Sequence, residues 1–272
     1  MKVLLVGDGY IGSYLSITNP LKGIELIIVD QKGYGSNRVI RYQDLTANDL
    51  KDFSAVLWFA GHSSVPSCIQ DPYGSVRNNL TDLMDFAVRL PSACHLIYAS
   101  SGSIYSDNMI DNQLSKHVNV YDAGKNALDD VLPHLKSNVT GLRMGTISGR
   151  SQRTRGELIF NAMNSSAINH GCVNVSNPEK SRSILFLSDL RLLILELLEM
   201  KSRPLIVDAC SYSDTIGSIG ERIASFYKVQ LNIQDPSVTY DFRMNVMQME
   251  SLVGPLSDFE DQCELYKKEV EK

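Results

Sequence analysis

Short apolar runs alternate with amphipathic stretches along the first half of the chain. The runs predict buried β-strands at Val3–Val6, Glu25–Asp30, Ala55–Ala60, His95–Ser100 and Val139–Met144. Between them, apolar positions recur with helical spacing at Ile11–Thr18, Asn78–Leu90 and Tyr121–Leu135. Strands this apolar, alternating with helices, are typical of a parallel sheet covered on both faces. The pattern therefore predicts an α/β fold.

The pattern changes after Arg150. Residues Ser151–Arg155 are polar and basic, and the strand alternation beyond them is weaker. Helical spacing returns at Glu157–Ile168, Leu187–Glu199 and Thr215–Tyr227. We expect residues 1–150 to form the main domain and residues 151–272 to form a smaller lobe. A strand near Pro204–Asp208 could return from this lobe to the main sheet.

Composition narrows the class of protein. The chain has 272 residues, and its net charge of −5 provides no basic field for a nucleic-acid backbone. Its cysteines lie far apart, without the spacing of a metal site or a redox pair, at Cys68, Cys94, Cys172, Cys210 and Cys263. The N-terminus does not resemble a signal peptide, and no apolar run is long enough to span a membrane. We expect a soluble, cytoplasmic protein without a metal, nucleic-acid or membrane partner.

A glycine-rich turn follows the first predicted strand directly. Residues Gly7-Asp8-Gly9-Tyr10-Ile11-Gly12 form the pattern G-x-G-x-x-G between a strand and a helix. The pattern meets three needs of a dinucleotide site: a tight turn, close approach of the backbone to a pyrophosphate, and close packing of helix on strand. Asp30 ends the second strand, where a carboxylate binds ribose hydroxyls and repels a 2′-phosphate. The expected cofactor is therefore NAD.

Together with motifs further along the chain, these residues resemble the extended short-chain dehydrogenase/reductase family, in its NAD-dependent epimerase/dehydratase branch. The resemblance implies a Rossmann-type doubly wound sheet with a smaller C-terminal substrate-binding lobe. It also implies further cofactor contacts beside Gly7, Gly9, Tyr10, Ile11, Gly12 and Asp30. Asp44 and Leu45, after a third short strand, look like the adenine-contacting pair; Ala60, Gly61 and Asn79 resemble residues that line the cofactor.

The same resemblance implies a catalytic set. Residues His95–Tyr105 look like the strand and loop that carry a catalytic serine, which the register places at Ser101. Tyr121 and Lys125 then supply Tyr-x-x-x-Lys, a spacing that puts both side chains on one side of a helix. Positive charge from Lys125 and an oxidised nicotinamide would lower the pKa of Tyr121, so that its phenolate could take a proton from a sugar hydroxyl. Ser101 would stabilise charge on the same oxygen.

Two departures limit the chemistry. Family members that dehydrate sugars carry an Asp-Glu pair where this chain has Gly102 and Ser103. Members that reduce a keto-sugar and also epimerise beside the ketone carry a cysteine where this chain has Ser103. Of the family's reactions, we therefore expect oxidation and reduction at one carbon, C4 of a hexose. We favour a nucleotide-sugar epimerase that retains NAD, over a 4-keto-sugar reductase that exchanges NAD(P)H. Two rival hypotheses are a non-catalytic dinucleotide-sensing regulator and a dehydrogenase for a non-sugar substrate.

The resemblance also implies a nucleotide-diphosphate-sugar partner. Its expected contacts are Ser103, Asn161, Arg182 and Arg243, since guanidinium groups bind phosphate oxygens through paired hydrogen bonds. The basic residues Arg150, Arg153 and Arg155 could line the cleft or lie in a solvated loop, and we favour the loop. The resemblance further implies a homodimer, formed through the helices that here are Asn78–Leu90 and Tyr121–Leu135.

Overall fold

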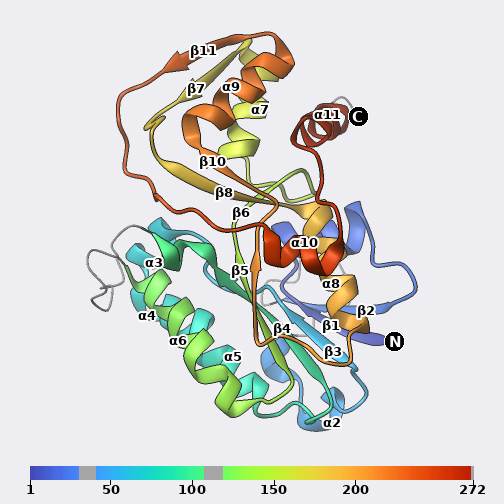
Figure 1. Cartoon of the computed structure of the whole chain (residues 1–272). Helices are drawn as coiled ribbons and strands as arrows, with labels where there is room; N and C mark the ends of the chain where they lie inside the picture. Colours follow the sequence, from blue (N-terminus) through green and yellow to red (C-terminus); the bar gives the residue numbers. More distant parts are fainter. Residues whose placement is uncertain (31–40, 107–118, 271–272) are drawn as a thin grey trace.

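The computed structural model describes residues 1–30, 41–106 and 119–270. Within them, six parallel strands form the main sheet in the order β2-β1-β3-β4-β5-β9 (Figure 1). Their bounds are β1 Lys2–Val6, β2 Glu25–Val29, β3 Ala55–Trp58, β4 His95–Ser101, β5 Val139–Met144 and β9 Ile206–Ala209. This order, with helices on both faces, confirms the expected α/β Rossmann-type sheet.

Alternation along the strands divides the main lobe into two apolar layers. Val3 and Leu5 of β1 face one layer, and Leu4 and Val6 face the other. The segments of the first face are α1 Tyr10–Ser13, the π-helical turn η1 Tyr14–Thr18, α8 Leu187–Glu199 and α10 Met247–Val253. The second face carries η2 Tyr42–Asp44, α2 Ala47–Leu50, α5 Asp82–Ala87 and α6 Val120–Leu135. The central strands β1, β3, β4 and β5 are therefore mostly buried on both sides, which explains their nearly continuous apolar sequences, whereas the edge strands β2 and β9 are only partly buried.

Shorter helical segments connect these layers. They are α3 Val65–Gln70, α4 Pro72–Val76, the π-helical turn η3 Arg77–Thr81 and the 3-10 turn η4 Gly102–Tyr105. In Figure 1, α3, α4 and α5 lie beside α6 on one side of the main sheet, and α8 and α10 lie on the other. The turn η4 follows β4 directly, so it carries the chain away from the sheet beside Ser101.

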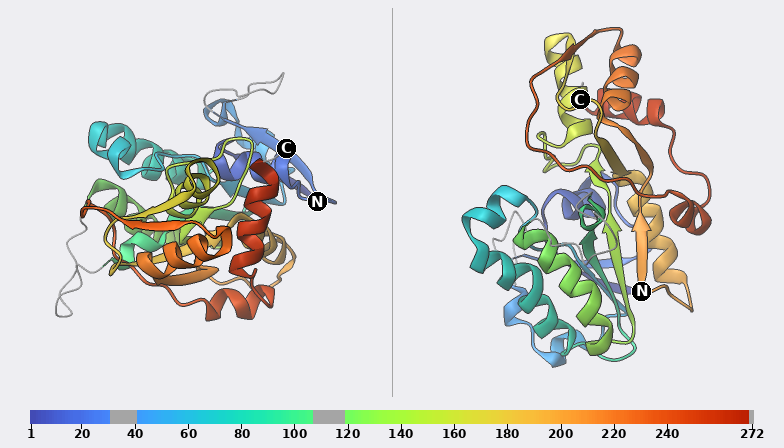
Figure 2. Two further views of the ribbon diagram at one scale, coloured as in Figure 1. Left: turned by 90° about the horizontal axis from the view of Figure 1, so that it is seen from above. Right: turned by 60° about the vertical axis from the view of Figure 1, so that its left-hand side comes forward.

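The second lobe has its own core. One small sheet has the order β10-β8-β6, formed by β6 Thr146–Ser148, β8 Ser181–Phe186 and β10 Tyr212–Thr215, and another pairs β7 Cys172–Val175 with β11 Gln230–Ile233. Helices α7 Ile159–His170, α9 Ile216–Tyr227 and α11 Phe259–Val270 complete the lobe. Its centre is aromatic: Phe160 contacts Phe186 and Phe259 edge to face, with ring centroids 5.2 and 5.5 Å apart. Figure 2 shows this lobe standing beyond one end of the main sheet.

Most expected elements occur near their predicted places, with informative differences. The helix expected at Ile11–Thr18 is split into α1 and the wider turn η1. The short strand expected before Asp44 falls largely on residues 31–40, outside the described residues, and Tyr42–Asp44 is a 3-10 turn. The strand β9 pairs with β5, so the main sheet takes its last strand from a segment that lies between two parts of the second lobe along the chain. The division at residue 150 stays a prediction.

Candidate active site

The end of β4 and the start of α6 bring the three expected catalytic residues together. Ser101 is the last residue of β4, and Tyr121 lies in the first turn of α6, close enough to Ser101 for this serine to lower the pKa of Tyr121. One turn further along α6, the Lys125 ammonium lies 5.8 Å from the centroid of the Tyr121 ring. The helix begins where it does because Asn119 caps it, with its side chain accepting the backbone N–H of Asp122 at 3.1 Å.

Burial dominates the protonation of this set. Lys125 is 6% exposed and donates to the carbonyl oxygen of Ala99 at 2.7 Å. Burial lowers the pKa of Lys125 from 10.5 to about 8, although the Asp129 carboxylate opposes that change. Burial also raises the pKa of Tyr121, and the effect of Ser101, which lowers this pKa, offsets the rise only in part. The lowering of the Tyr121 pKa by an oxidised nicotinamide stays a prediction.

A buried carboxylate that the sequence analysis missed lies behind the catalytic serine. Ser101 Oγ is 2.7 Å from Ser103 Oγ, and Ser103 Oγ donates to Asp122 Oδ1 at 2.5 Å. Asp122 is 2% exposed, and its other oxygen accepts from Asn119 at 2.7 Å and from the Tyr240 hydroxyl at 3.1 Å. Ser103, which we expected to bind substrate, is 5% exposed and is committed to this carboxylate.

The glycine-rich turn has the geometry that a dinucleotide needs. Gly7 has φ +107°, and a Cβ there would lie 2.6 Å from the backbone nitrogen of Ala60. A Cβ at Gly12 would lie 2.0 Å from the carbonyl oxygen of Gly7, whereas a Cβ at Gly9 would have no neighbour within 4 Å. Only Gly9 therefore presents open backbone, and the two other glycines are fixed by packing. A turn that is tight inside and open at its tip fits a bound pyrophosphate.

The remaining expected cofactor residues surround this turn. The Asp30 carboxylate accepts the backbone N–H of Asp8 at 2.8 Å, so the end of β2 is tied to the turn. Asp44 is exposed and Leu45 is buried. Ile11 is partly buried, and the Tyr10 side chain leaves the turn to contact the second lobe, where its hydroxyl donates to the Gly149 carbonyl.

Gly61 and Asn79 form a second close approach, just beyond Ala60. Gly61 has φ +145°, and a Cβ there would lie 2.3 Å from Asn79 Oδ1. Asn79 is 3% exposed; its amide donates to the carbonyl of His62 at 3.0 Å, and its Oδ1 is buried without a hydrogen-bond partner among the described residues. The residues present therefore fit NAD, with Gly9, Asp30 and Lys125 as the groups that would hold it.

Two arginines after β6 reach back to the main lobe, a connection that the sequence analysis did not foresee. Arg153 forms an ion pair with Asp8 of the glycine-rich turn, with Nη1 and Oδ1 2.8 Å apart. Arg155 pairs with Glu157 at 2.7 Å and donates to the carbonyl of Ser63 at 2.9 Å. Both side chains are about one quarter exposed, so these arginines border the cofactor side of the cleft.

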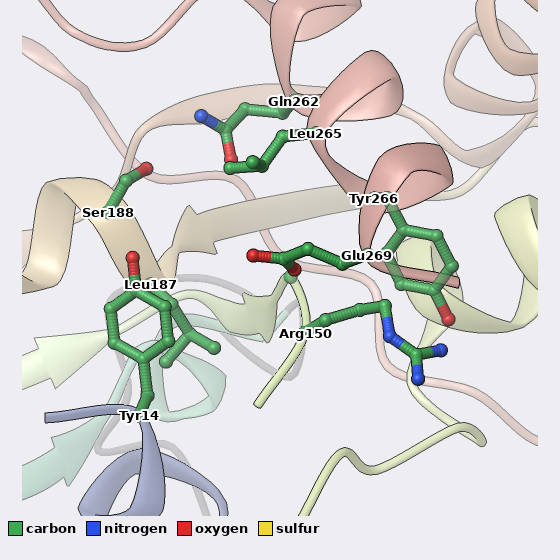
Figure 3. Close-up of a pocket in the computed structure, with 9 residues that line it drawn as sticks. Tyr14, Arg150, Leu187, Ser188, Gln262, Leu265, Tyr266 and Glu269 are labelled. Carbon is green, nitrogen blue, oxygen red and sulfur yellow. The ribbon is translucent and has the colours of Figure 1, made fainter. Parts of the chain in front are cut away.

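Arg150 lies elsewhere, in a small cavity between the lobes. Figure 3 shows it near Tyr14, Glu269 and Tyr266, and its guanidinium lies 5.5 Å from the centroid of the Tyr266 ring. The cavity has a volume of about 10 Å³, room for about one water molecule. It therefore cannot hold a cofactor or a sugar.

The expected substrate residues fall into different environments. Asn161 is fully buried; its amide donates to the Tyr10 hydroxyl at 2.8 Å, and its oxygen accepts the Gly149 N–H at 2.9 Å. Those contacts join the two lobes, and nothing in this geometry supports substrate contact by Asn161. Arg182, on β8, is 9% exposed, and burial lowers its pKa to about 10.

The segment that follows β11 covers Arg182 and leads to Arg243. Arg182 Nη2 donates to the carbonyl of Tyr240 at 2.8 Å, and its Nε is buried without a hydrogen-bond partner among the described residues. Arg243 is exposed and lines an open pocket of about 600 Å³ together with Ser211, Tyr212, Ser213, Met244, Asn245 and Val246. Met244 connects this pocket to the catalytic loop, because a Cβ at Gly102 would lie 2.2 Å from its sulfur.

The described residues 1–30, 41–106 and 119–270 contain no group of three or more His, Cys, Asp or Glu side chains that could hold a metal ion. No helix within these ranges is long and apolar enough to cross a membrane.

Comparisons with known proteins agree with this geometry. The chain matches the family described as the NAD dependent epimerase/dehydratase family over residues 3–208. No curated protein sequence matches the chain.

Solved structures share its fold at low identity. One is TunA, an NAD-dependent NDP-hexosamine 5,6-dehydratase involved in tunicamycin biosynthesis, with 17% identity, a TM-score of 0.80 and coverage of 100% of this chain and 98% of that chain. A second is UDP-glucuronic acid 4-epimerase from Bacillus cereus in complex with UDP-glucuronic acid and NAD, with 16% identity, a TM-score of 0.77 and coverage of 100% and 99%. A third is RMD from Pseudomonas aeruginosa complexed with NADPH, with 17% identity, a TM-score of 0.73 and coverage of 98% and 97%.

The family match covers well over half of the chain, and the glycine-rich turn, Ser101, Tyr121 and Lys125 lie together at the carboxyl end of the sheet. The protein is therefore an NAD-dependent enzyme that belongs to the NAD dependent epimerase/dehydratase family.

Proposed function

We propose that the protein is an epimerase that acts on a nucleotide-diphosphate-sugar by transient oxidation at one sugar carbon, C4. The observation that carries this proposal is that Ser101, the last residue of β4, and Tyr121, in the first turn of α6, lie close together, with the Lys125 ammonium 5.8 Å from the centroid of the Tyr121 ring. These are the groups needed to move one proton on and off a hydroxyl. At Gly102 and Ser103 the chain lacks the Asp-Glu pair of the family's sugar dehydratases.

Each residue of the set has one task in the proposed reaction. NAD, held by Gly9, Asp30 and Lys125, would supply the hydride chemistry for oxidation and reduction at the sugar carbon. Tyr121 Oη takes the proton from the sugar hydroxyl during oxidation and gives it back during reduction. Ser101 Oγ holds the same sugar oxygen, and Lys125 holds the ribose hydroxyls and favours the phenolate by its charge.

The pocket beside Gly102 suits a sugar nucleotide. Its volume of about 600 Å³ lies within the range of sites that bind molecules of this size. Arg243 offers an exposed guanidinium to a diphosphate. Arg182 lies under the same segment, and its buried Nε has no hydrogen-bond partner in the part of the chain that the structure describes. Complexes of similar structures with UDP-glucuronic acid and NAD support this class of substrate.

Analysis of the released cofactor separates the epimerase from the reductase and the sensor. The purified protein is denatured, and the supernatant is examined by mass spectrometry; about one NAD per chain supports an enzyme that retains its cofactor. The native protein is then incubated with UDP- and dTDP-hexoses, and C4 epimers are separated by chromatography. A cofactor-free protein that oxidises added NADH or NADPH with a 4-keto-sugar would instead be the reductase. NAD binding without turnover of any sugar or non-sugar alcohol would indicate a sensor.

Substitution of Tyr121 tests the catalytic assignment. Tyr121→Phe should leave NAD binding intact and lower turnover at least about a hundredfold, the usual contribution of a general acid–base group. Tyr73→Phe is a matched control, because Tyr73 lies on α4 and is 82% exposed. Turnover in Tyr121→Phe equal to that of the control would remove Tyr121 from the mechanism.

We also propose a cytoplasmic homodimer formed through η3, α5 and α6. This side of the protein exposes large apolar side chains, with Val88 59%, Leu135 40% and Val131 37% exposed. An exposed apolar surface of this kind is typical of an interface. Analytical ultracentrifugation should give twice the chain mass, and Val131→Glu should give the mass of one chain; a monomeric wild-type protein would refute the dimer.

A further inference from the structure

The segment after β6, residues 149–155, forms a loop whose two ends are bonded to one buried side chain. The Asn161 oxygen accepts the N–H of Gly149 at 2.9 Å, and the Asn161 amide donates to the carbonyl of Arg155 at 2.9 Å. Asn161 is fully buried, so a single rigid side chain fixes both ends of the loop. This loop, residues 149–155, is called the strap.

The middle of the strap lies against the segment that follows the glycine-rich turn. Ser151 Oγ and Ser13 Oγ are within hydrogen-bond distance, 3.1 Å apart, and Ser13 is the last residue of α1. The backbone N–H of Gln152 donates to Thr18 Oγ1 at 3.3 Å, and Thr18 ends η1. These contacts hold the strap beside α1 and η1, so its position relative to the turn is defined.

The strap carries an arginine to the ends of two adjacent strands. Arg153 forms its ion pair with Asp8, two residues after β1, and Arg155 donates to the carbonyl of Ser63, in the loop after β3. The order of the sheet reverses here, because β2 lies on one side of β1 and β3 on the other. In doubly wound sheets, ligands bind in the crevice outside the carboxyl ends of the strands at such a point. Both guanidinium groups therefore border the crevice expected to hold the cofactor.

Asp8 places a negative charge where the glycine-rich turn must accept an anion. It precedes Gly9, the glycine of the turn that presents open backbone. The Asp8 side chain is 9% exposed, so water and salt screen its charge only weakly. A pyrophosphate at the turn would be repelled by this carboxylate. Arg153 can offset the repulsion, because its Nη1 lies 2.8 Å from Asp8 Oδ1 and also donates to the Asp8 carbonyl.

We propose that Arg153 is a cofactor-binding residue, whose guanidinium neutralises Asp8 and binds the pyrophosphate of NAD at the glycine-rich turn. A guanidinium can bond both anions at once, because it has five N–H donors in a planar fork. The Arg153 side chain is 26% exposed, so part of it is accessible to a ligand. The strap holds this residue in place before NAD binds, which reduces the entropy lost on binding. An epimerase and a reductase would need Arg153 alike, so its role does not depend on the reaction proposed above.

Two variants give different results for a cofactor-binding residue and for an ion pair that only joins the lobes. Arg153→Ala should weaken NAD binding at least about tenfold, the loss expected for a hydrogen bond to a charged group. Asp8→Asn removes the negative charge and keeps the size of the side chain, so NAD should bind as tightly as to the wild type or more tightly. The double variant should bind NAD more tightly than Arg153→Ala alone. A pair that only joins the lobes would lose affinity equally in both single variants.

The measurement is calorimetric titration of the cofactor-free protein with NAD, in the absence of any sugar. ADP-ribose, which keeps the pyrophosphate, should lose as much affinity in Arg153→Ala as NAD does, whereas binding of adenosine, followed by saturation-transfer NMR, should not change. Arg191→Ala is the matched control, because Arg191 is another partly exposed arginine that donates to a backbone carbonyl, that of Asn19, at 3.2 Å. The fluorescence of Trp58, which is 2% exposed, shows whether each variant is folded.

An NAD affinity in Arg153→Ala equal to that of the wild type would overturn the inference. A loss in Asp8→Asn as large as that in Arg153→Ala, or an equal loss of adenosine binding, would also overturn it. If Arg153→Ala does not fold, Asp8→Asn decides alone. Failure of the proposed function gives a different result: no nucleotide-sugar is epimerised at C4 by the wild-type protein, while NAD binding still responds to Arg153→Ala.

Discussion

The active site needs Lys125 for its chemistry, but the buried ammonium should lower the stability of the folded protein. The pKa of Lys125 falls from 10.5 to about 8 on folding, because burial disfavours the charged form. At about 1.4 kcal/mol for each pH unit, the folded state is destabilised by roughly 3 kcal/mol at neutral pH. Lys125→Met removes the charge and keeps the length of the side chain, but loses the hydrogen bond to Ala99, which contributes about 1 kcal/mol. We expect the variant to be more stable by about 2 kcal/mol.

The single tryptophan of the chain provides the assay. Trp58 lies in β3, is 2% exposed, and packs between Tyr42 and Phe86 with centroids 4.9 and 5.0 Å apart. Unfolding of the main lobe must expose it, so urea titrations of the cofactor-free protein can be followed by its fluorescence. The expected result at pH 7 is a higher urea midpoint for Lys125→Met, with an unchanged slope.

The pH dependence gives the sign of the effect. The pKa of Lys125 is lower in the folded state than in the unfolded state. The destabilisation by its buried charge is therefore at its full value below pH 8, declines between pH 8 and 10.5, and disappears above that range. The advantage of Lys125→Met should therefore shrink by about 2 kcal/mol or more between pH 7 and pH 10. A variant that is less stable than the wild type at pH 7, or an advantage that does not change with pH, would refute the reasoning.

Further predictions concern the cofactor turn, the buried ion pair and the substrate pocket. Gly9→Ala should fold normally and bind NAD at least about tenfold more weakly by calorimetry, and an NAD affinity equal to that of the wild type would contradict the open turn. Gly7→Ala should instead unfold at a lower urea concentration, because its Cβ would lie 2.6 Å from the backbone nitrogen of Ala60. Asp129→Asn leaves Arg143 without the carboxylate 2.8 Å away and should lose about 3 kcal/mol in the Trp58 assay, an expectation that a loss below about 0.5 kcal/mol would disprove. Arg243→Ala should weaken UDP-sugar binding at least about tenfold, while removal of an exposed arginine outside the pocket should not; equal effects would exclude a diphosphate contact.

The main sheet could be predicted because its signals are local. Apolar runs such as Val3–Val6 are followed at once by glycines whose φ and close contacts require that residue type. The small strands of the second lobe were missed for the opposite reason. The strand β10, Tyr212–Thr215, is polar and short, and pairing with β8 rather than its own sequence makes it a strand.

The catalytic set could be predicted from spacing, but its surroundings could not. Tyr121 and Lys125 lie four residues apart on one helix, so local geometry fixes their relation. Asp122 looks like an ordinary acidic residue in the first turn of a helix, and its burial depends on Tyr240, far along the chain. The ion pair of Arg153 with Asp8 is another contact that only the folded chain creates.

The position of β9 has a consequence for synthesis of the protein. Residues 145–205 are synthesised after β5 and before β9, at about 5–20 residues per second. The edge of β5 that pairs with β9 therefore stays unpaired for several seconds. During that time its backbone is an unprotected edge, open to pairing with other nascent chains. Expression should therefore be sensitive to chaperone supply, and a fragment that stops at residue 150 should aggregate instead of accumulating as a smaller enzyme.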